Sequence, residues 1–203
     1  NAQAAFGFDL KTKLRDTRSA LDILKPEVLV LHDLHDHESR NHHHEKDVSH
    51  NFEMAIRDRE SIVEELKKAL KFLEHAARPN MDILVIDSNH DLALERYVRE
   101  GRYRGDGVNF RFGLAMDCAY HDWRAAMAEA LDKDLPTPAF SLLEWALREL
   151  GDKYMASVSW VYDGRSHEID GVQVGYHGFR GVNGAKGTVN GYARLGHAIT
   201  IGD

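Results

Sequence analysis

The hydrophobic pattern changes period several times along the chain. In some segments apolar residues recur at spacings of three, four and seven, which indicates amphipathic helices, and in others they form short continuous runs, which are typical of buried strands. The predicted helices are Ala2–Leu24, Phe52–His75, Asp91–Glu100, most of Asp106–Asp134, and Phe140–Leu150. The predicted strands are Glu27–Leu31, Met81–Ile86, Met155–Tyr162, Gly171–Tyr176 and Ala198–Ile201. Alternation of apolar strands with helices predicts a layered α/β fold with helices outside a central sheet.

The length of the chain fits one domain. It has 203 residues, of which 43% are apolar and 29% charged, and we find no repeat, low-complexity linker or second domain boundary. We therefore expect residues 1–203 to form a single globular domain. The chain opens directly in helical patterning and closes on a strand-like run that ends at Gly202-Asp203, so we expect a fragment of a longer protein, truncated at both ends.

The charge, the cysteine content and the hydropathy limit the possible partners and the cellular compartment. A formal net charge of -7 gives no general attraction to nucleic acid or to anionic membranes, so an anionic substrate would have to be bound by local positive charge or by metal. Cys118 is the single cysteine, which excludes an internal disulfide and suits a reducing compartment such as the cytoplasm. Since no apolar stretch approaches the ~20 residues of a membrane span, we expect no membrane association.

Reactive side chains follow the carboxyl ends of four predicted strands. These segments are His32–Glu38, Asp87–Asp91, His177-Gly178 and Gly202-Asp203. Ligands of open α/β sheets bind outside the carboxyl ends of the strands, so the four segments are expected to converge. Their carboxylate, imidazole and amide-oxygen donors suit a divalent metal such as manganese, iron or zinc. The residues alone leave a metal site and a chance grouping of solvated loop residues equally open.

The order of these segments resembles the calcineurin-like metallophosphoesterase family. In that family Gly-Asp-x-x-Asp follows one strand, Gly-Asn-His-Asp or Glu the next, then His-Gly, then Gly-His-x-His. The matching stretches here are Asp33-x-x-Asp36, Ser88-Asn89-His90-Asp91, His177-Gly178 and Gly202-Asp203. The stretch His177–Gly187 is also similar to a longer loop of phage-encoded members. The resemblance spans Glu27–Asp203 and implies the family's metallophosphoesterase-like fold, with a central mixed β-sheet flanked by helices.

The resemblance also implies two divalent metal ions, for which we expect Mn²⁺, with iron or zinc as alternatives. Asp33 matches the carboxylate that bridges both ions, and Asn89 and His177 match ligands of the second ion. Asp203 stands where the family has a histidine, and we expect it to be a metal ligand as well, because a carboxylate can ligate manganese or iron. The family's Asp-x-His on its first strand is absent here and is expected upstream of Asn1.

His90 and Asp91 are the expected catalytic residues. His90 matches the family's non-ligand histidine, which faces the substrate phosphate and protonates the leaving oxygen, and Asp91 would orient its ring. Two departures from the pattern concern the turns: His32 and Ser88 replace glycines of the family motifs, so both turns need a different backbone conformation.

Four further residues are predicted to contact substrate. Arg40 and His43 lie in the histidine-rich loop, for which a solvated loop without a substrate role is the competing interpretation. Arg180 and Lys186 lie in the glycine-rich loop, where cations and exposed N–H groups suit phosphate. The tryptophans fall in helix or strand patterns and are expected in the core rather than stacked on bases; they are Trp123, Trp145 and Trp160.

The function predicted from the resemblance is hydrolysis of phosphodiester bonds by a DNA nuclease acting in host-DNA degradation. DNA is the expected substrate, and a phage-encoded protein would act in the host cytoplasm. Two alternatives stay open: a phosphomonoesterase or protein phosphatase, and a non-catalytic metal-binding module that handles DNA. The sequence also leaves open whether the chain forms a homo-oligomer.

Overall fold

The computed structural model describes residues 19–41, 43–44, 46–162, 164–181, 186–194, 196 and 198–202. The predicted N-terminal helix falls mostly outside these residues, and its described part is α2 (Ala20–Leu24), where the Ser19 side chain accepts a hydrogen bond from the Asp22 N–H. The predicted metal ligand Asp203 also lies outside the described residues.

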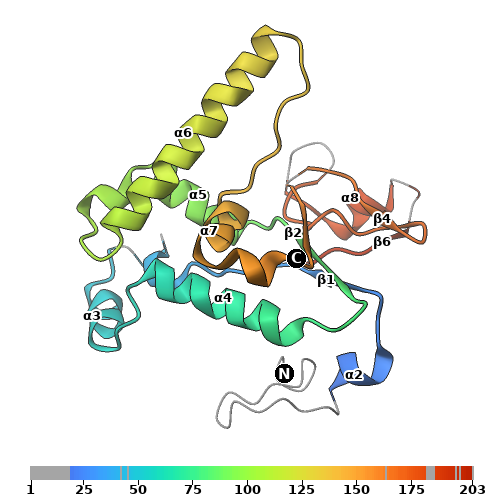
Figure 1. Ribbon diagram of the computed structural model, residues 1–203, viewed down its shortest axis with the longest axis horizontal. Helices are drawn as coiled ribbons and strands as arrows, with labels where there is room; N and C mark the ends of the chain where they lie inside the picture. Colours follow the sequence, from blue (N-terminus) through green and yellow to red (C-terminus); the bar gives the residue numbers. More distant parts are fainter. Residues whose placement is uncertain are drawn as a thin grey trace.

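A parallel three-stranded sheet forms the centre of the fold (Figure 1). Its strands are β1 (Val28–Leu31), β2 (Asp82–Ile86) and β3 (Val158–Val161), in the order β1-β2-β3. The middle strand is apolar on both faces: Ile83 and Val85 pack among the helices, and Leu84 and Ile86 pack on the opposite side. Continuous apolar runs are typical of parallel strands that are covered on both faces, so the sequence pattern and the burial agree.

Helices cover one face of this sheet. α4 (Ile62–Ala76) and α7 (Leu142–Gly151) contact each other, and Leu66 and Leu73 of α4 join Leu143 and Leu147 of α7 in the main core. Both helices begin at a serine, Ser61 and Ser141, whose side chain accepts a hydrogen bond from a backbone N–H three residues later. α5 (Leu92–Arg99) follows β2 directly and packs against α7.

The predicted helix over Phe52–His75 is two helices. α3 (Val48–Ile56) ends before Asp58, whose φ of 52° is left-handed, and α4 begins after Ser61. A left-handed residue followed by a serine cap stops one helix and starts another, which the unbroken apolar stripe in the sequence did not indicate. Three short 3-10 helices complete this layer: η1 (Glu38–Arg40), η2 (Arg102–Gly105) and η3 (Asp152–Met155).

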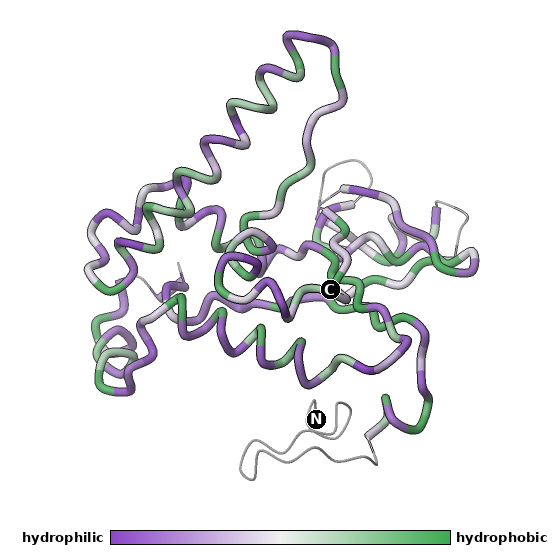
Figure 2. Tube along the Cα trace, in the orientation of Figure 1, coloured by the Kyte–Doolittle hydropathy of each residue, from purple (hydrophilic) through white to green (hydrophobic). Residues whose placement is uncertain are grey.

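The long helix α6 (Phe110–Asp132) extends away from the rest of the molecule (Figure 1). Its first half packs through Gly113, Met116 and Tyr120, and Figure 2 shows that hydrophilic and hydrophobic positions alternate along its length. A Cβ at Gly113 would lie 2.3 Å from the Tyr103 Cβ, so the glycine allows close approach of η2. None of the described helices is long and apolar enough to cross a membrane.

A second small sheet covers the other face of the parallel sheet. It consists of β4 (Glu168–Ile169), β5 (Val172–Gln173) and β6 (Ala198–Ile199), with β4-β5 antiparallel and β5-β6 parallel. The helix α8 (Val189–Ala193) lies between β5 and β6 in the chain. Val174 packs against Leu84, Ile86 and Val161 of the first sheet.

The fold is α/β as predicted, but its strands form two sheets rather than one central mixed sheet. Asp170 and Gly171, with φ of 50° and 78°, turn the chain between β4 and β5, and β5 pairs with β4 and with β6.

Candidate functional site

Loops that follow strands of both sheets meet at one place, as the order of the motifs predicted. The His177 Nε2 lies 3.0 Å from the Asp33 Oδ2. The Gly202 N–H donates to the His177 carbonyl at 2.7 Å, and a Cβ on Gly202 would lie 2.5 Å from the His32 Cγ. The segments after β1, β5 and β6 are therefore in contact, although residues 33 and 177 are 144 positions apart.

Asp33 has an unusual backbone and a stabilised charge. Its φ of 53° lies in the left-handed region, which aspartate tolerates better than most residues. Burial acts to raise the pKa of Asp33, but hydrogen bonds from His177 and Ser88 outweigh it, and the pKa is lowered. The carboxylate is therefore ionised at neutral pH, as a metal ligand or a partner of a cationic group must be.

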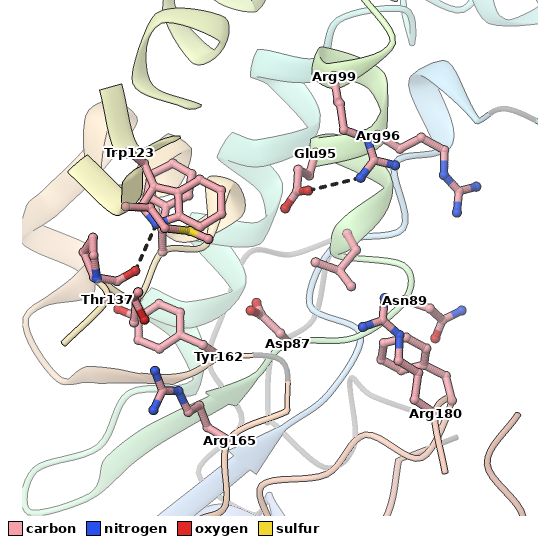
Figure 3. Close-up of a pocket in the computed structure, with 16 residues that line it drawn as sticks. Asp87, Asn89, Glu95, Arg96, Arg99, Trp123, Thr137, Tyr162, Arg165 and Arg180 are labelled. Atoms are coloured by element: carbon pink, nitrogen blue, oxygen red, sulfur yellow. Dashed lines mark hydrogen bonds and ion pairs between the residues drawn. The ribbon is translucent and has the colours of Figure 1, made fainter. Parts of the chain in front are cut away.

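Ser88 connects the loop after β2 to Asp33. It is fully buried, its hydroxyl hydrogen-bonds the Asp33 carboxylate, and its Oγ accepts from the Asp91 N–H at 3.1 Å. Ser88 thus positions Asp33 directly, a role that could not be predicted from the sequence. Asn89, the next residue, is exposed, and its side chain lines a cavity together with Arg180 (Figure 3).

The donor chemistry of the Asp33–His177 pair fits a divalent ion. Two ligand atoms at right angles, each about 2.1 Å from one ion, lie about 3 Å apart, which is the separation of these two side chains. The buried His177 Nδ1 and both ring nitrogens of His32 have no hydrogen-bond partner among the described residues. Within that part of the chain, however, no group of three histidine, cysteine, aspartate or glutamate side chains is placed to hold a metal. The metal site therefore stays a proposal.

His90 pairs with Asp36 and not with Asp91. Its Nδ1 lies 2.6 Å from the Asp36 Oδ1, and this hydrogen bond raises the pKa of His90 above its usual value. Asp91 is buried and its Oδ1 accepts from the His35 N–H at 2.8 Å, so it holds the loop after β1. The predicted orienting role of Asp91 is corrected on geometric grounds, because consecutive residues entering a helix point in different directions.

Asp91 is itself in an unusual environment. Burial raises its pKa to about 7, even though hydrogen bonds from His35 and Ser88 act in the opposite direction. Its Oδ2 is buried and finds no hydrogen-bond partner among the described residues. Asp91 therefore links the loops after β1 and β2. Asp36, rather than Asp91, holds the ring of His90.

Arg40, which is predicted to contact substrate, makes contacts within the protein. Its Nε lies 2.5 Å and its second guanidinium nitrogen 2.9 Å from the two Asp106 carboxylate oxygens, and it also donates to the Ser39 carbonyl. A bidentate pair of this kind uses the donors that a phosphate would need. His43 is exposed on the following turn, and its substrate role stays a prediction.

Arg180 and Lys186 are paired across the glycine-rich loop as an antiparallel bridge. Arg180 is exposed and its guanidinium lies 5.0 Å from the centre of the Phe179 ring. It lines a cavity of about 360 Å³ beside His177 as well as the larger cavity beside Asn89. Arg180 is therefore adjacent to the Asp33–His177 pair, while Lys186 is exposed outside both cavities.

Comparison with known proteins gives one informative similarity. No family model matches the chain, and no solved structure matches it significantly. The chain is 31% identical over 188 residues to "Protein A1" of Escherichia phage T5. The aligned region covers 91% of this chain and 32% of that protein. The chain thus spans about a third of the length of the curated relative that it matches. The similarity supports a phage origin and leaves the activity to be proposed.

Proposed function

We propose that this chain carries part of the active site of a divalent-metal-dependent phosphoesterase that hydrolyses phosphodiester bonds in DNA. The observation that carries the proposal is the contact of Asp33 with His177 at a point where loops after β1, β2, β5 and β6 meet. The contact supports the proposal because it joins a carboxylate and an imidazole, both of which are metal ligands, at the ends of strands from both sheets.

The residues have distinct roles in this proposal. Asp33 and His177 would hold metal, and Asn89 and Asp203 are the further ligands that the family resemblance implies. Two divalent ions, for which Mn²⁺ is our expectation, would supply a hydroxide nucleophile at neutral pH and neutralise charge on the phosphate.

His90 is the proposed proton donor to the leaving oxygen. Its side chain is 47% exposed, so it is accessible to substrate, and Asp36 holds its Nδ1. With Nδ1 bound to a carboxylate, the Nε2 is the nitrogen that faces outward and carries the proton to the departing oxygen. A positioned proton donor of this kind contributes roughly 10²–10⁴-fold to the rate.

DNA is the proposed substrate for two reasons. The motif resemblance is to phage-encoded metallophosphoesterases connected with destruction of host DNA, and the similarity to a phage protein supports the same setting. The exposed Arg180 beside His177 supplies local positive charge in a chain whose formal net charge is -7. In a host cell the activity would degrade host DNA in the cytoplasm.

The test uses the full-length protein with linear DNA and Mn²⁺. We expect cleavage that a chelator stops, and a fall of roughly 10²–10⁴-fold in His90→Ala with metal binding unchanged. His121→Ala is the matched control, because His121 is also exposed and pairs with an aspartate, Asp117, but lies on α6. Its cleavage rate should equal that of the wild type.

Other outcomes separate the alternatives. Rapid hydrolysis of a phosphomonoester with DNA left intact would identify a phosphatase. Metal-loaded protein that cleaves neither DNA, a phosphomonoester nor a small chromogenic phosphodiester would identify a non-catalytic module. Equal loss of metal in His90→Ala and Asp33→Ala would show that His90 is a ligand and that the assigned roles are wrong.

A further inference from the structure

A cavity with a volume of about 640 Å³ opens beside Asn89 (Figure 3). This volume lies within the range of pockets that take ligands of nucleotide size, roughly 300–1,000 Å³. Its walls come from α5, from α6 with the segment that returns from it, and from the loops after β3 and β5. The cavity therefore brings the predicted site residues Asn89 and Arg180 together with α5, α6 and the loop after β3.

Four exposed arginines surround this cleft: Arg96, Arg99, Arg165 and Arg180. Figure 3 shows them distributed around the opening, with Asp87 at its centre. The lining contains two carboxylates, of which Asp87 accepts hydrogen bonds from Ser141 and Trp160 and Glu95 lies 3.7 Å from Arg99. The cleft is therefore positive in a protein whose formal net charge is -7, which concentrates an anionic ligand there.

Four aromatic side chains also line the cleft. Trp123, predicted to be a core residue, packs against the core and also lines the cleft, where its Nε1 donates to the Pro138 carbonyl at 3.0 Å. Its ring stacks on Phe140 with centroids 5.2 Å apart and an interplanar angle of 14°. Tyr162 and Phe179 complete the set. The projecting α6 thus contributes Trp123 to a cleft that is lined by aromatic rings and bordered by arginines.

We propose that this cleft binds a single-stranded stretch of the DNA substrate. Its arginines contact backbone phosphates, and its aromatic side chains contact unstacked bases; this combination of cations and aromatic rings is what binds single strands without sequence preference. A duplex keeps its bases stacked and cannot present their faces to these rings. The inference rests on the proposed function and deepens it, since Asp87, Phe179 and Arg180 line both the cleft and the cavity beside His177.

Two double variants test the role of the arginines. Arg99→Ala with Arg165→Ala removes two cleft cations, and Arg57→Ala with Arg59→Ala removes the same charge elsewhere. Arg57 is a close match for Arg99, because both side chains are 57% exposed and both pair with a glutamate four residues earlier. All four arginines are exposed, so neither double variant is expected to unfold.

Binding is measured by fluorescence anisotropy with a labelled single-stranded oligonucleotide and with its duplex, in chelator and over a range of salt. We expect the Arg99→Ala, Arg165→Ala variant (the cleft variant) to bind the single strand about 10-fold more weakly than the wild type. The slope of the logarithm of its binding constant against the logarithm of the salt concentration (the salt slope) should decrease in magnitude by about 1.4, or about 0.7 per lost phosphate contact. The control variant should stay within about twofold of the wild type. Equal weakening in both variants, no binding by the wild type, or duplex binding as tight as single-strand binding would overturn the proposal.

Trp123→Leu supplies a second, independent measurement. Loss of a stacking ring should weaken single-strand binding by about 10-fold without changing the salt slope, because stacking releases no counterions. Unchanged affinity in this variant would contradict the role of the aromatic side chains.

The same experiments separate this proposal from the proposed function. Binding in chelator needs no metal, so a wild type that binds single strands through the cleft but cleaves no DNA with Mn²⁺ would contradict the function alone. If the wild type cleaves DNA with Mn²⁺, and the Arg99→Ala, Arg165→Ala variant binds and cleaves DNA equally well, only the proposed role of the cleft would be contradicted.

Discussion

Asp106 is expected to contribute to the free energy of unfolding by an amount that depends on pH. Its carboxylate accepts hydrogen bonds from Arg40, from the Tyr97 hydroxyl at 2.9 Å and from the Asn109 Nδ2 at 2.8 Å, and its side chain is only 8% exposed. These contacts join η1, α5 and the start of α6. Asp106→Asn keeps the shape of the side chain but removes the charge on which the network depends.

The magnitude follows from the pKa of Asp106. Burial acts to raise this pKa, but hydrogen bonds from Arg40, Asn109 and Tyr97 outweigh it and lower it from 3.8 to about 2. At ~1.36 kcal/mol per unit, the ionised form contributes about 2 kcal/mol to the free energy of unfolding. Because the folded pKa is depressed, this contribution is complete above about pH 5 and is lost as the pH falls toward 2, with about 1 kcal/mol gone by pH 3.

Urea unfolding at pH 7 and at pH 3 measures the effect. Asp106→Asn should be less stable than the wild type by about 2 kcal/mol at pH 7, and the difference should shrink by about 1 kcal/mol at pH 3. Asp132→Asn, at an exposed position in the last turn of α6, should change stability by less than about 0.5 kcal/mol. A difference between the wild type and Asp106→Asn that is the same at both pH values would refute the electrostatic explanation.

Two further predictions concern close packing and the support of the candidate site. Gly113→Ala should lower the free energy of unfolding by about 1–3 kcal/mol despite the better helix propensity of alanine, because the new methyl group would meet Tyr103; thermal melting as high as that of the wild type would contradict this. Ser88→Ala should weaken Mn²⁺ binding of the full-length protein by roughly 10–100-fold by releasing the Asp33 carboxylate, and calorimetric titration showing unchanged affinity would mean that Ser88 does not position it.

Much of the fold could be predicted because its strong signals are local. The runs that became β1 and β2 are apolar on both faces, and α4 and α7 carry clear apolar stripes. The arrangement of the short strands could not be predicted, since β4, β5 and β6 have two residues each and β5 pairs with β6 across a long stretch of the chain. Strands of that length have too few residues for a hydrophobic period.

The candidate site divides in the same way. The order of the motifs predicted that Asp33 and His177 would meet, because the ends of strands converge at a sheet edge. The partner of His90 and the contacts of Arg40 could not be predicted, since they depend on side-chain directions that spacing does not specify. Arg40 was assigned to substrate because it lies in the histidine-rich loop, yet its guanidinium donates to the carboxylate of Asp106, 66 residues away in the sequence.

Metal binding by the full-length protein tests the central claim most directly. Titration with Mn²⁺, followed by electron paramagnetic resonance of the free ion, gives the number and affinity of bound ions without depending on substrate. We expect the wild type to bind Mn²⁺ and Asp33→Ala to lose that binding, whereas Asp36→Asn should keep it, because Asp36 lies against His90 rather than His177. Mn²⁺ affinity in Asp33→Ala equal to that of the wild type would contradict the assignment of the site.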